Sequence, residues 1–371
     1  MTAAIKTIPL EDVFLAELPE AGEDWRALLR ADLAERGLPH RRVEEWKWSD
    51  LRAALARMGG DAGSIAVDAS RAPDETAPVA QAPTLVMPRL AAALGGPADI
   101  YRLTDGEALN LDISAKPGAA HKVIAIELPA GVEASLHERY AGAAGAFANV
   151  AVLIRLGEGA RLTRLIEQDA SSDAVMVVTS GIELSANARA TQTTLGFGAK
   201  LARLETHVTH PGEGADLSLD GAYIVGDKLH LDQTTFVRHT GEGGTTSELF
   251  KGAAAKGGRG VFQGKIFVER AAQKTDARMT HRGLLLDEGA EIDAKPELEI
   301  YADDVECAHG NALGAIDETA LFYMRQRGIP EPQARALLTE SFLAEPLMAI
   351  ADEAERERLL EKLRARLKEV A

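Results

Sequence analysis

The sequence predicts a mainly β protein with α-helical regions at both ends, and three observations support this fold class. Short runs of alternating apolar residues, each closed by Gly, Pro, Asn or Asp, extend from about residue 112 to residue 310, as is typical of strands. A four-residue turn motif recurs through the same stretch. Helical patterns occur before and after this stretch but do not interrupt it, which disfavours a doubly wound α/β sheet.

The N-terminal region, residues 1–58, contains an amphipathic helix. Four of its apolar residues share one helical face, and Gly37 follows as a stop signal. The four are Trp25, Leu28, Leu29 and Leu33. Residues 59–104 are rich in Ala, Asp and Pro, and we interpret this segment as a linker that leads into the β region.

The turn motif indicates an internal repeat. Each copy joins a turn residue to a short apolar alternation, and successive turn residues lie 28, 28 and 27 positions apart. These turn residues are Gly131, Gly159, Asn187 and Gly214. Gly289 begins a further copy out of strict phase. A period of this size suits stacked β coils, so we expect a parallel β-helix over residues 105–310, with a large antiparallel β-sandwich as the alternative.

The C-terminal region, residues 311–371, returns to helical patterns. Asp317 can cap a helix that runs to Arg327 and ends at Gly328. A second helix follows Pro330, and the last segment carries leucines at four-residue steps. These leucines are Leu359, Leu363 and Leu367. The helices therefore offer an apolar stripe for packing on the β region or on another protein.

Composition and charge argue against several classes of partner. The 371 residues are 46% hydrophobic and 26% charged, which is ordinary for a globular protein. The formal charge of −16 would repel phosphate backbones, so we expect no nucleic-acid partner. No apolar run is long enough to span a membrane, and the first residues lack a secretory pattern, so we expect a cytoplasmic protein with no membrane partner. The single cysteine excludes an intrachain disulfide.

Two kinds of enzyme fit the sequence poorly. The stretch Gly260–Ile266 approaches a nucleotide-binding P-loop, but its glycines are one residue too close, and Ile266 stands where Ser or Thr must reach magnesium. Polysaccharide-cleaving β-helix enzymes need two carboxylates at a defined separation. Asp303 and Asp304 are adjacent and would face opposite ways on a strand. We therefore expect neither of these two activities from this chain.

Cys307 and His309 form the candidate site. In an extended segment both side chains lie on one face, with Cα atoms roughly 6.5 to 7 Å apart, close enough to converge on one soft metal. Alternatively, Cys307 continues an inward apolar row and His309 ends it. One thiolate and one imidazole are too few to hold an iron–sulfur cluster, so any remaining ligands would come from another chain.

Several short segments of the C-terminal third follow one another in a specific order and spacing. They are Gly264–Val268, Ala272–Ala277, Leu284–Leu286, Pro296–Ile300, Ala302–Gly310 and Leu321–Ile329. In this order they resemble the SufB/SufD family of iron–sulfur cluster assembly proteins, closely over about residues 260–345 and more loosely over the predicted β-helix. The segment Arg42–Trp48, the modest length and the single cysteine resemble the shorter branch of the family rather than the longer, more cysteine-rich SufB.

The resemblance implies a right-handed parallel β-helix that pairs with SufB and with the ATPase SufC. It places Cys307 and His309 where the two β-helices meet, as candidate ligands of an iron–sulfur cluster that is bound transiently in the complex, with no cofactor held stably by this chain alone. It also implies that the ATPase docks on the C-terminal helices. The candidate docking residues are Leu321, Phe322, Tyr323, Leu337, Leu338 and Phe342.

From the resemblance we expect a non-ATPase scaffold subunit that contributes to cluster building or iron acquisition at its interface with SufB. One alternative is a purely structural β-helix adaptor that recruits the ATPase, and a less favoured one is a polysaccharide-cleaving enzyme. The sequence does not decide whether the isolated chain forms a homodimer, which an exposed seam would favour.

Overall fold

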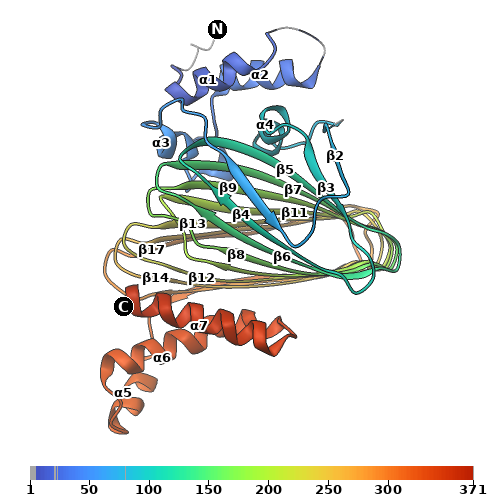
Figure 1. Ribbon diagram of the computed structural model, residues 1–371. Helices are drawn as coiled ribbons and strands as arrows, with labels where there is room; N and C mark the ends of the chain where they lie inside the picture. Colours follow the sequence, from blue (N-terminus) through green and yellow to red (C-terminus); the bar gives the residue numbers. More distant parts are fainter. Residues whose placement is uncertain (1–5, 21, 23, 80, 371) are drawn as a thin grey trace.

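The centre of the molecule is a parallel β-solenoid of about eight turns, with helices against its two outer faces (Figure 1). The fold is that of a computed structural model, which describes residues 6–20, 22, 24–79 and 81–370. Two nine-stranded sheets, A and B, enclose one continuous apolar core. Successive strands from β3 to β18 alternate between the sheets, so each turn of the chain adds one strand to each sheet. The predicted mainly β fold with helical ends is confirmed.

All neighbouring strands from β3 to β18 pair in parallel, which excludes the antiparallel β-sandwich. In spatial order, sheet B consists of β1 Ile65–Ala69, β4 Ala108–Ala115, β6 Glu133–Gly142, β8 Arg161–Gln168, β10 Arg189–Gly196, β12 Asp216–Val225, β14 Thr245–Ala254, β16 Asp276–Leu285 and β18 Glu306–Gly314. Sheet A consists of β2 Glu75–Ala77, β3 Ala98–Arg102, β5 Gly118–Leu128, β7 Ala146–Leu156, β9 Val175–Leu184, β11 Leu201–His210, β13 His230–His239, β15 Arg259–Val268 and β17 Glu291–Ile300.

The predicted turn residues form one corner of the solenoid. Gly131, Gly159, Asn187 and Gly214 all have positive φ, from 55° to 72°. Glycine adopts this conformation without steric cost, and asparagine tolerates it better than most residues. Each backbone N–H donates to a carbonyl of the next coil, as from Gly159 to Ala186 O at 2.9 Å. Gly289 is out of phase because it lies at the opposite corner, where the chain enters sheet A.

The N-terminal helices pack on the outer face of sheet A (Figure 1). They are α1 Pro9–Glu17, α2 Trp25–Arg36, the 3₁₀ helix η1 Glu44–Trp46, α3 Leu51–Leu55 and α4 Val86–Leu94. The predicted amphipathic helix is α2, which Asp24 caps. Leu29 and Leu33 are buried in the apolar cluster that the N-terminal helices form with sheet A, whereas Leu28 is 60% exposed.

The segment 59–104, which we predicted as a linker, is instead built into the fold. It contains β1, β2, α4 and β3. Strand β1 pairs antiparallel with β4, and β2 pairs antiparallel with β3. Pro88 lies in the first turn of α4, where a missing N–H breaks no helical hydrogen bond. The proline-rich composition therefore marks the joints between short elements.

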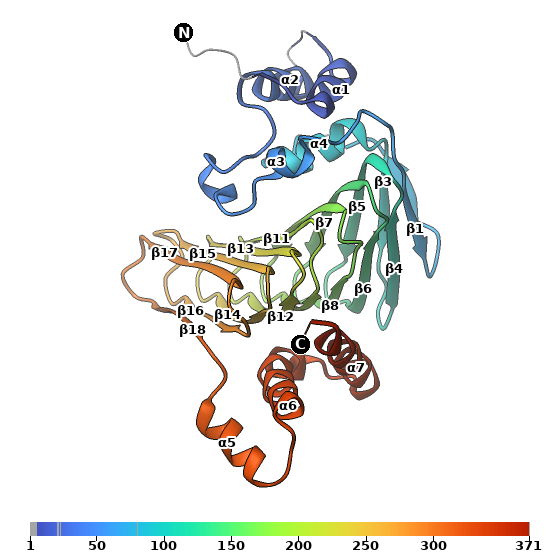
Figure 2. The ribbon, with the colours of Figure 1, turned by 90° about the vertical axis from the view of Figure 1, so that its left-hand side faces the viewer.

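The C-terminal helices lie on the outer face of sheet B (Figure 2). They are α5 Glu318–Gln326, α6 Glu331–Ala344, the 3₁₀ helix η2 Glu345–Ala349 and α7 Glu353–Val370. Asp317 caps α5 by accepting a 2.8 Å hydrogen bond from Thr319 N–H, and Gly328 follows the helix with φ 84°, as predicted. The predicted leucine row of α7 is buried against the sheet, while α5 projects away from it. None of the helices within the described residues is long and apolar enough to cross a membrane.

Candidate functional site

The candidate site lies at the end of the solenoid formed by β17 and β18 (Figure 2). Among the described residues no strand pairs with the outer edge of either one. The Glu306 N–H donates to the carbonyl of Thr275, the residue just before β16, and N–H groups alternate in direction along a strand. The N–H groups of Cys307 and His309 therefore point to the free edge. With no further coil above them, Ile300 and Leu313 are 38% and 44% exposed.

Cys307 points into the solenoid and is half-buried. It lies in register with Ala277 of β16, whose side chain belongs to the buried core. Burial raises the pKa of the Cys307 thiol, the Asp276 carboxylate raises it further, and a hydrogen bond with the Ala277 backbone opposes the shift. The thiol is therefore protonated at neutral pH, and it becomes a ligand only when a metal ion or a nearby cation displaces the proton.

His309 follows on the same inward row but is exposed. Its partner in register is Met279, which is 1% exposed inside the core. No described residue forms a hydrogen bond with the His309 imidazole. The structure thus brings Cys307 and His309 to one face, as the sequence suggested, and presents a thiol and an imidazole at the rim of an open core. This donor set suits a soft metal or a metal–sulfur species delivered as substrate.

A chain of hydrogen-bonded side chains, which we term the relay, lies behind the row of Cys307 and His309. It consists of Tyr223, His281 and Asn311. His281 of β16 lies in register with Asn311, the next inward residue of β18 after His309. The His281 Nδ1 is 2.8 Å from Asn311 Oδ1, and the His281 Nε2 is 3.1 Å from the Tyr223 hydroxyl. The His281 ring is fully buried and stacks on Phe262 with 4.8 Å between ring centroids and 3° between planes.

Glycines within the strands make room for the relay. A Cβ atom at Gly252 would lie 1.8 Å from Tyr223 Cζ, and one at Gly260 would lie 2.4 Å from Tyr223 Cε2. Only a residue without a side chain can occupy these positions while the tyrosine ring fills the core. Sequence reasoning missed His281, Tyr223 and Asn311. The glycines inside predicted strands, and the position of Asn311 two residues after His309, were the available signals.

The predicted docking residues divide into exposed and covered groups. Phe322 and Tyr323 of α5 are 59% and 62% exposed, and Leu337 of α6 is 41% exposed. Leu321 is 1% exposed, and Phe342 packs at the core between sheet B and the C-terminal helices, with Lys251 Nζ 4.5 Å from its ring centroid. Leu338 is partly buried. The surface available for a partner is therefore the projecting α5 and the adjoining side of α6.

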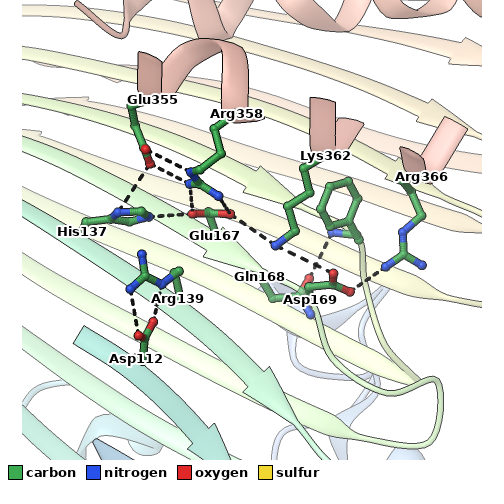
Figure 3. Close-up of polar contacts among 11 residues, drawn as sticks. Asp112, His137, Arg139, Glu167, Gln168, Asp169, Glu355, Arg358, Lys362 and Arg366 are labelled. Atoms are coloured by element: carbon green, nitrogen blue, oxygen red, sulfur yellow. Dashed lines mark hydrogen bonds and ion pairs between the residues drawn. The ribbon is translucent and has the colours of Figure 1, made fainter. Parts of the chain in front are cut away.

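A charged cluster, which we term the α7 clasp, fastens the last helix to sheet B (Figure 3). Its residues are His137, Glu167, Asp169, Glu355, Arg358, Lys362 and Arg366. Glu167, 2% exposed, accepts hydrogen bonds from Arg358, from Lys362 at 3.2 Å and from His137 at 2.6 Å. Burial raises the pKa of Glu167, but the hydrogen bonds from His137 and Arg358 and the charge of Lys362 outweigh it and hold that pKa well below its usual range.

Part of the clasp has the composition of a metal site. One ligand atom from each of His137, Glu167 and Glu355 lies within 4.8 Å of the other two. However, Arg358 pairs with both carboxylates, and Lys362 adds a second positive charge to Glu167. A metal ion would have to displace these cations. The arrangement is therefore an ion-pair network that holds α7 in place.

Comparison with known proteins agrees with this architecture. Residues 111–342 match the family model for the SufBD core domain of SUF-system FeS cluster assembly, and this stretch covers more than half of the chain. The chain belongs to the SufBD family. The matched stretch covers the solenoid from β4 onward, the candidate site, α5 and most of α6.

Curated relatives of the chain include a SufD protein and other members of the SufBD family. The iron–sulfur cluster assembly protein SufD of Escherichia coli is 36% identical over 171 residues, which are 46% of this chain and 40% of that protein. A SufBD family protein of Synechocystis is 32% identical over 201 residues, 54% of this chain and 44% of the relative. One from Mycobacterium tuberculosis is 32% identical over 210 residues, 54% of this chain and 53% of the relative. The chain thus matches about half the length of these relatives, and the prediction of the SufD branch is confirmed.

Proposed function

We propose that this chain is the non-ATPase scaffold subunit of an iron–sulfur cluster assembly complex. In this proposal the open end of the solenoid pairs with a second β-solenoid, SufB, and the projecting C-terminal helices bind the ATPase SufC. The observation that carries the proposal is the open end itself, where two long edge strands lie uncovered and place Cys307 and His309 at the rim of the core.

The edge strands favour a β-rich partner. An uncovered strand presents a row of backbone donors and acceptors, which another strand can satisfy. Strand β18 has nine residues and β17 has ten, so each offers a long template. The inward residues at this end, including Ile300 and Leu313, provide apolar surface that a second solenoid of the same cross-section would cover.

Cys307 and His309 support a role in cluster building at this seam. Neither side chain is fully buried, so both can be reached from the partner's side. Two donors cannot complete a cluster site, and the remaining ligands would come from the partner. Deprotonation of Cys307 would accompany metal binding, because burial keeps its thiol protonated otherwise.

The α5–α6 unit supports a second interface. Phe322 and Tyr323 are large apolar residues that project from a helix with a single buried residue, Leu321. Exposed aromatic residues on a projecting helix are typical anchors of a protein interface. The chain itself offers no P-loop, because the stretch Gly260–Ile266 falls within strand β15, so the ATPase would be a separate chain.

The test is co-expression with SufB and SufC under anaerobic conditions, followed by light scattering of the purified assembly. The proposal expects a complex that contains all three chains. It also expects the substitution Phe322→Asp to release the ATPase while SufB is retained. Leu28→Asp on α2 is the matched control, because Leu28 is equally exposed at 60% but lies on the opposite face of the molecule. A chain that purifies without either partner would overturn the proposal.

A purely structural adaptor is the second candidate, and the packing of Cys307 against the core favours it. The substitution His309→Ala separates the two functions. Loss of cluster assembly in a complex of unchanged mass supports the ligand role, whereas unchanged assembly supports the adaptor. A polysaccharide-cleaving enzyme finds no support, because Asp303 and Asp304 lie in an exposed turn and Asp304 pairs with Lys274.

A further inference from the structure

We propose that Asn311 is a further positioning residue of the open end, whose side-chain N–H groups hydrogen-bond an anionic sulfur, a sulfide or a thiolate, held beside His309. The inference rests on the proposed function and adds to it a residue and a ligand class. It starts from the relay of Tyr223, His281 and Asn311, which ends at the same rim as the candidate ligands.

The relay has one consistent direction. A neutral imidazole has one nitrogen that donates and one that accepts. The His281 Nδ1 faces Asn311 Oδ1, which can only accept, so the Nδ1–H donates to it and the Nε2 then accepts from the Tyr223 hydroxyl. Burial lowers the pKa of His281 to about 4, so the ring stays neutral at physiological pH. The carboxamide oxygen of Asn311 therefore faces the interior, and its amino group faces the opening.

The buried part of the relay is held rigidly. Tyr223 and His281 are fully buried, and the His281 ring is stacked on Phe262. Gly252 and Gly260 leave no free space around Tyr223, because a Cβ atom at either position would overlap its ring. A side chain anchored in this way loses little additional entropy when it binds a ligand, which is how a positioning residue contributes to affinity.

The Asn311 amino group is free to bind a ligand. No described residue accepts a hydrogen bond from Asn311 Nδ2, and the residue is exposed. Asn311 and His309 are neighbours on one face of β18, with Cα atoms roughly 6.5 to 7 Å apart. A ligand atom bound to the His309 imidazole would lie within reach of an N–H donor at that spacing. The soft donors Cys307 and His309 in the same row favour metal-bound sulfur as that atom.

We expect Asn311 to act by donating a hydrogen bond to the metal-bound sulfur, without binding the metal itself. N–H donors to cluster sulfur stabilise the added negative charge of the reduced form and so raise the reduction potential. Loss of such a partner typically lowers metal-site affinity about 10-fold to 100-fold. Asn311→Asp keeps the oxygen that accepts from His281 and replaces the amino group with a second oxygen. It is therefore the most direct test.

The first measurement uses the isolated chain and the ¹⁵N chemical shifts of the His281 ring. The proposal expects Nδ1 to carry the proton and Nε2 to be the acceptor. The Nε2 resonance should shift in Tyr223→Phe, but not in Tyr140→Phe, which removes another buried hydroxyl that bonds Glu138 instead. A ring protonated on Nε2 would mean that Asn311 turns its amino group inward, and this result would overturn the inference.

The second measurement uses the complex with SufB and SufC, reconstituted with iron and sulfide. Asn311→Asp should accelerate loss of the cluster to a chelator at least about 10-fold and lower its reduction potential, at unchanged complex mass. His281→Phe keeps an aromatic ring in the stack but frees the carboxamide, and it should act in the same direction. Unchanged cluster lifetime in both variants would overturn the inference.

The outcomes also separate this inference from the proposed function. If the wild-type chain fails to assemble, the proposed function is overturned, and the inference falls with it. If the wild type assembles and Asn311→Asp weakens the complex while cluster lifetime is unchanged, Asn311 is an ordinary interface residue. In that case the inference fails and the proposed function stands.

Discussion

The two ends of the solenoid are finished in different ways. At the N-terminal end, β1 and β2 reverse direction and pair antiparallel with β4 and β3. They are short, with five and three residues, and β1 packs Ile65 and Val67 against the core. At the C-terminal end, β17 and β18 keep the parallel direction and nearly full length, and no described strand pairs with their outer edges.

The N-terminal end shows that this fold can close an end with short antiparallel strands. The exposure of the C-terminal end is therefore not a general property of the fold. Short reversed edge strands discourage the addition of another strand, whereas long regular ones invite it. We therefore expect residues of the sealed part to determine stability and residues of the open end to determine assembly. The following predictions test that division, from the largest expected effect to the smallest.

Acid should destabilise the sealed interior through two neighbouring buried histidines. The ring centroids of His210 and His239 are 4.3 Å apart, and both side chains are fully buried. Burial lowers the pKa of His210 to about 3, with the charge of His239 adding to the shift, and burial lowers that of His239 to about 4. Below pH 6.5 the unfolded chain binds protons that the folded chain does not, so stability falls with pH until these lower values are reached.

The double variant His210→Leu with His239→Val should remove this dependence. Val268, the next residue in the same row, shows that an aliphatic side chain fits there. Between pH 7 and pH 5 the unfolding free energy of the wild type should fall by about 4 kcal/mol more than that of the variant. Urea denaturation at the two pH values measures the difference. Equal pH dependence of the two proteins would show that these histidines are not responsible.

A buried ion pair near the closed end should contribute almost as much to the unfolding free energy. Arg164 and Glu138 are 1% and 0% exposed, and Glu138 is the carboxylate paired with this guanidinium. The substitution Glu138→Gln should cost about 3 kcal/mol of unfolding free energy, because it leaves a buried charge without its partner. Glu133→Gln is the control. Glu133 lies on the same strand, pairs with Arg161 at the surface, and should change stability by about 0.5 kcal/mol or less.

The open end should show the reverse behaviour. Leu313→Lys places a charge on an exposed residue of the free edge, which weakens strand addition. We expect the affinity for SufB to fall about 10-fold or more, with no loss of thermal stability. Ala66→Lys places the same charge on exposed β1 at the closed end and should leave assembly unchanged. If Ala66→Lys impaired assembly as strongly, the division between the two ends would be wrong.

Local chemistry explains which parts of the fold the sequence predicts. The corner residues Gly131, Gly159 and Asn187 repeat because each needs a positive φ, so the constraint is visible at every coil. Asp317 and Gly328 mark the ends of α5 for similarly local reasons. Segment 59–104 was misread because β1 and β2 owe their existence to pairing with β4 and β3, which composition does not report.

The site was predictable only in part for the same reason. Alternation along one strand is enough to place Cys307 and His309 on one face. The contact between Asn311 and His281 depends on the length of the coil that separates the two strands, which no short motif encodes. An amphipathic pattern also does not state which neighbour an apolar face meets. Leu321 and Phe342 therefore looked like partner residues, although both pack within the chain.

The α7 clasp has a mechanical consequence. The helix is tied to β6 and β8 through His137 and Glu167, while Glu345 at the start of η2 binds Lys251 of β14. The C-terminal unit therefore straps together the coils from β6 to β14 of sheet B. A pull applied at α5 would act on this strap through α6, and on β18 through the three residues that join β18 to α5. The part of the load that passes through α6 would be shared among the coils held by the strap, so these coils would move together as one stiff body.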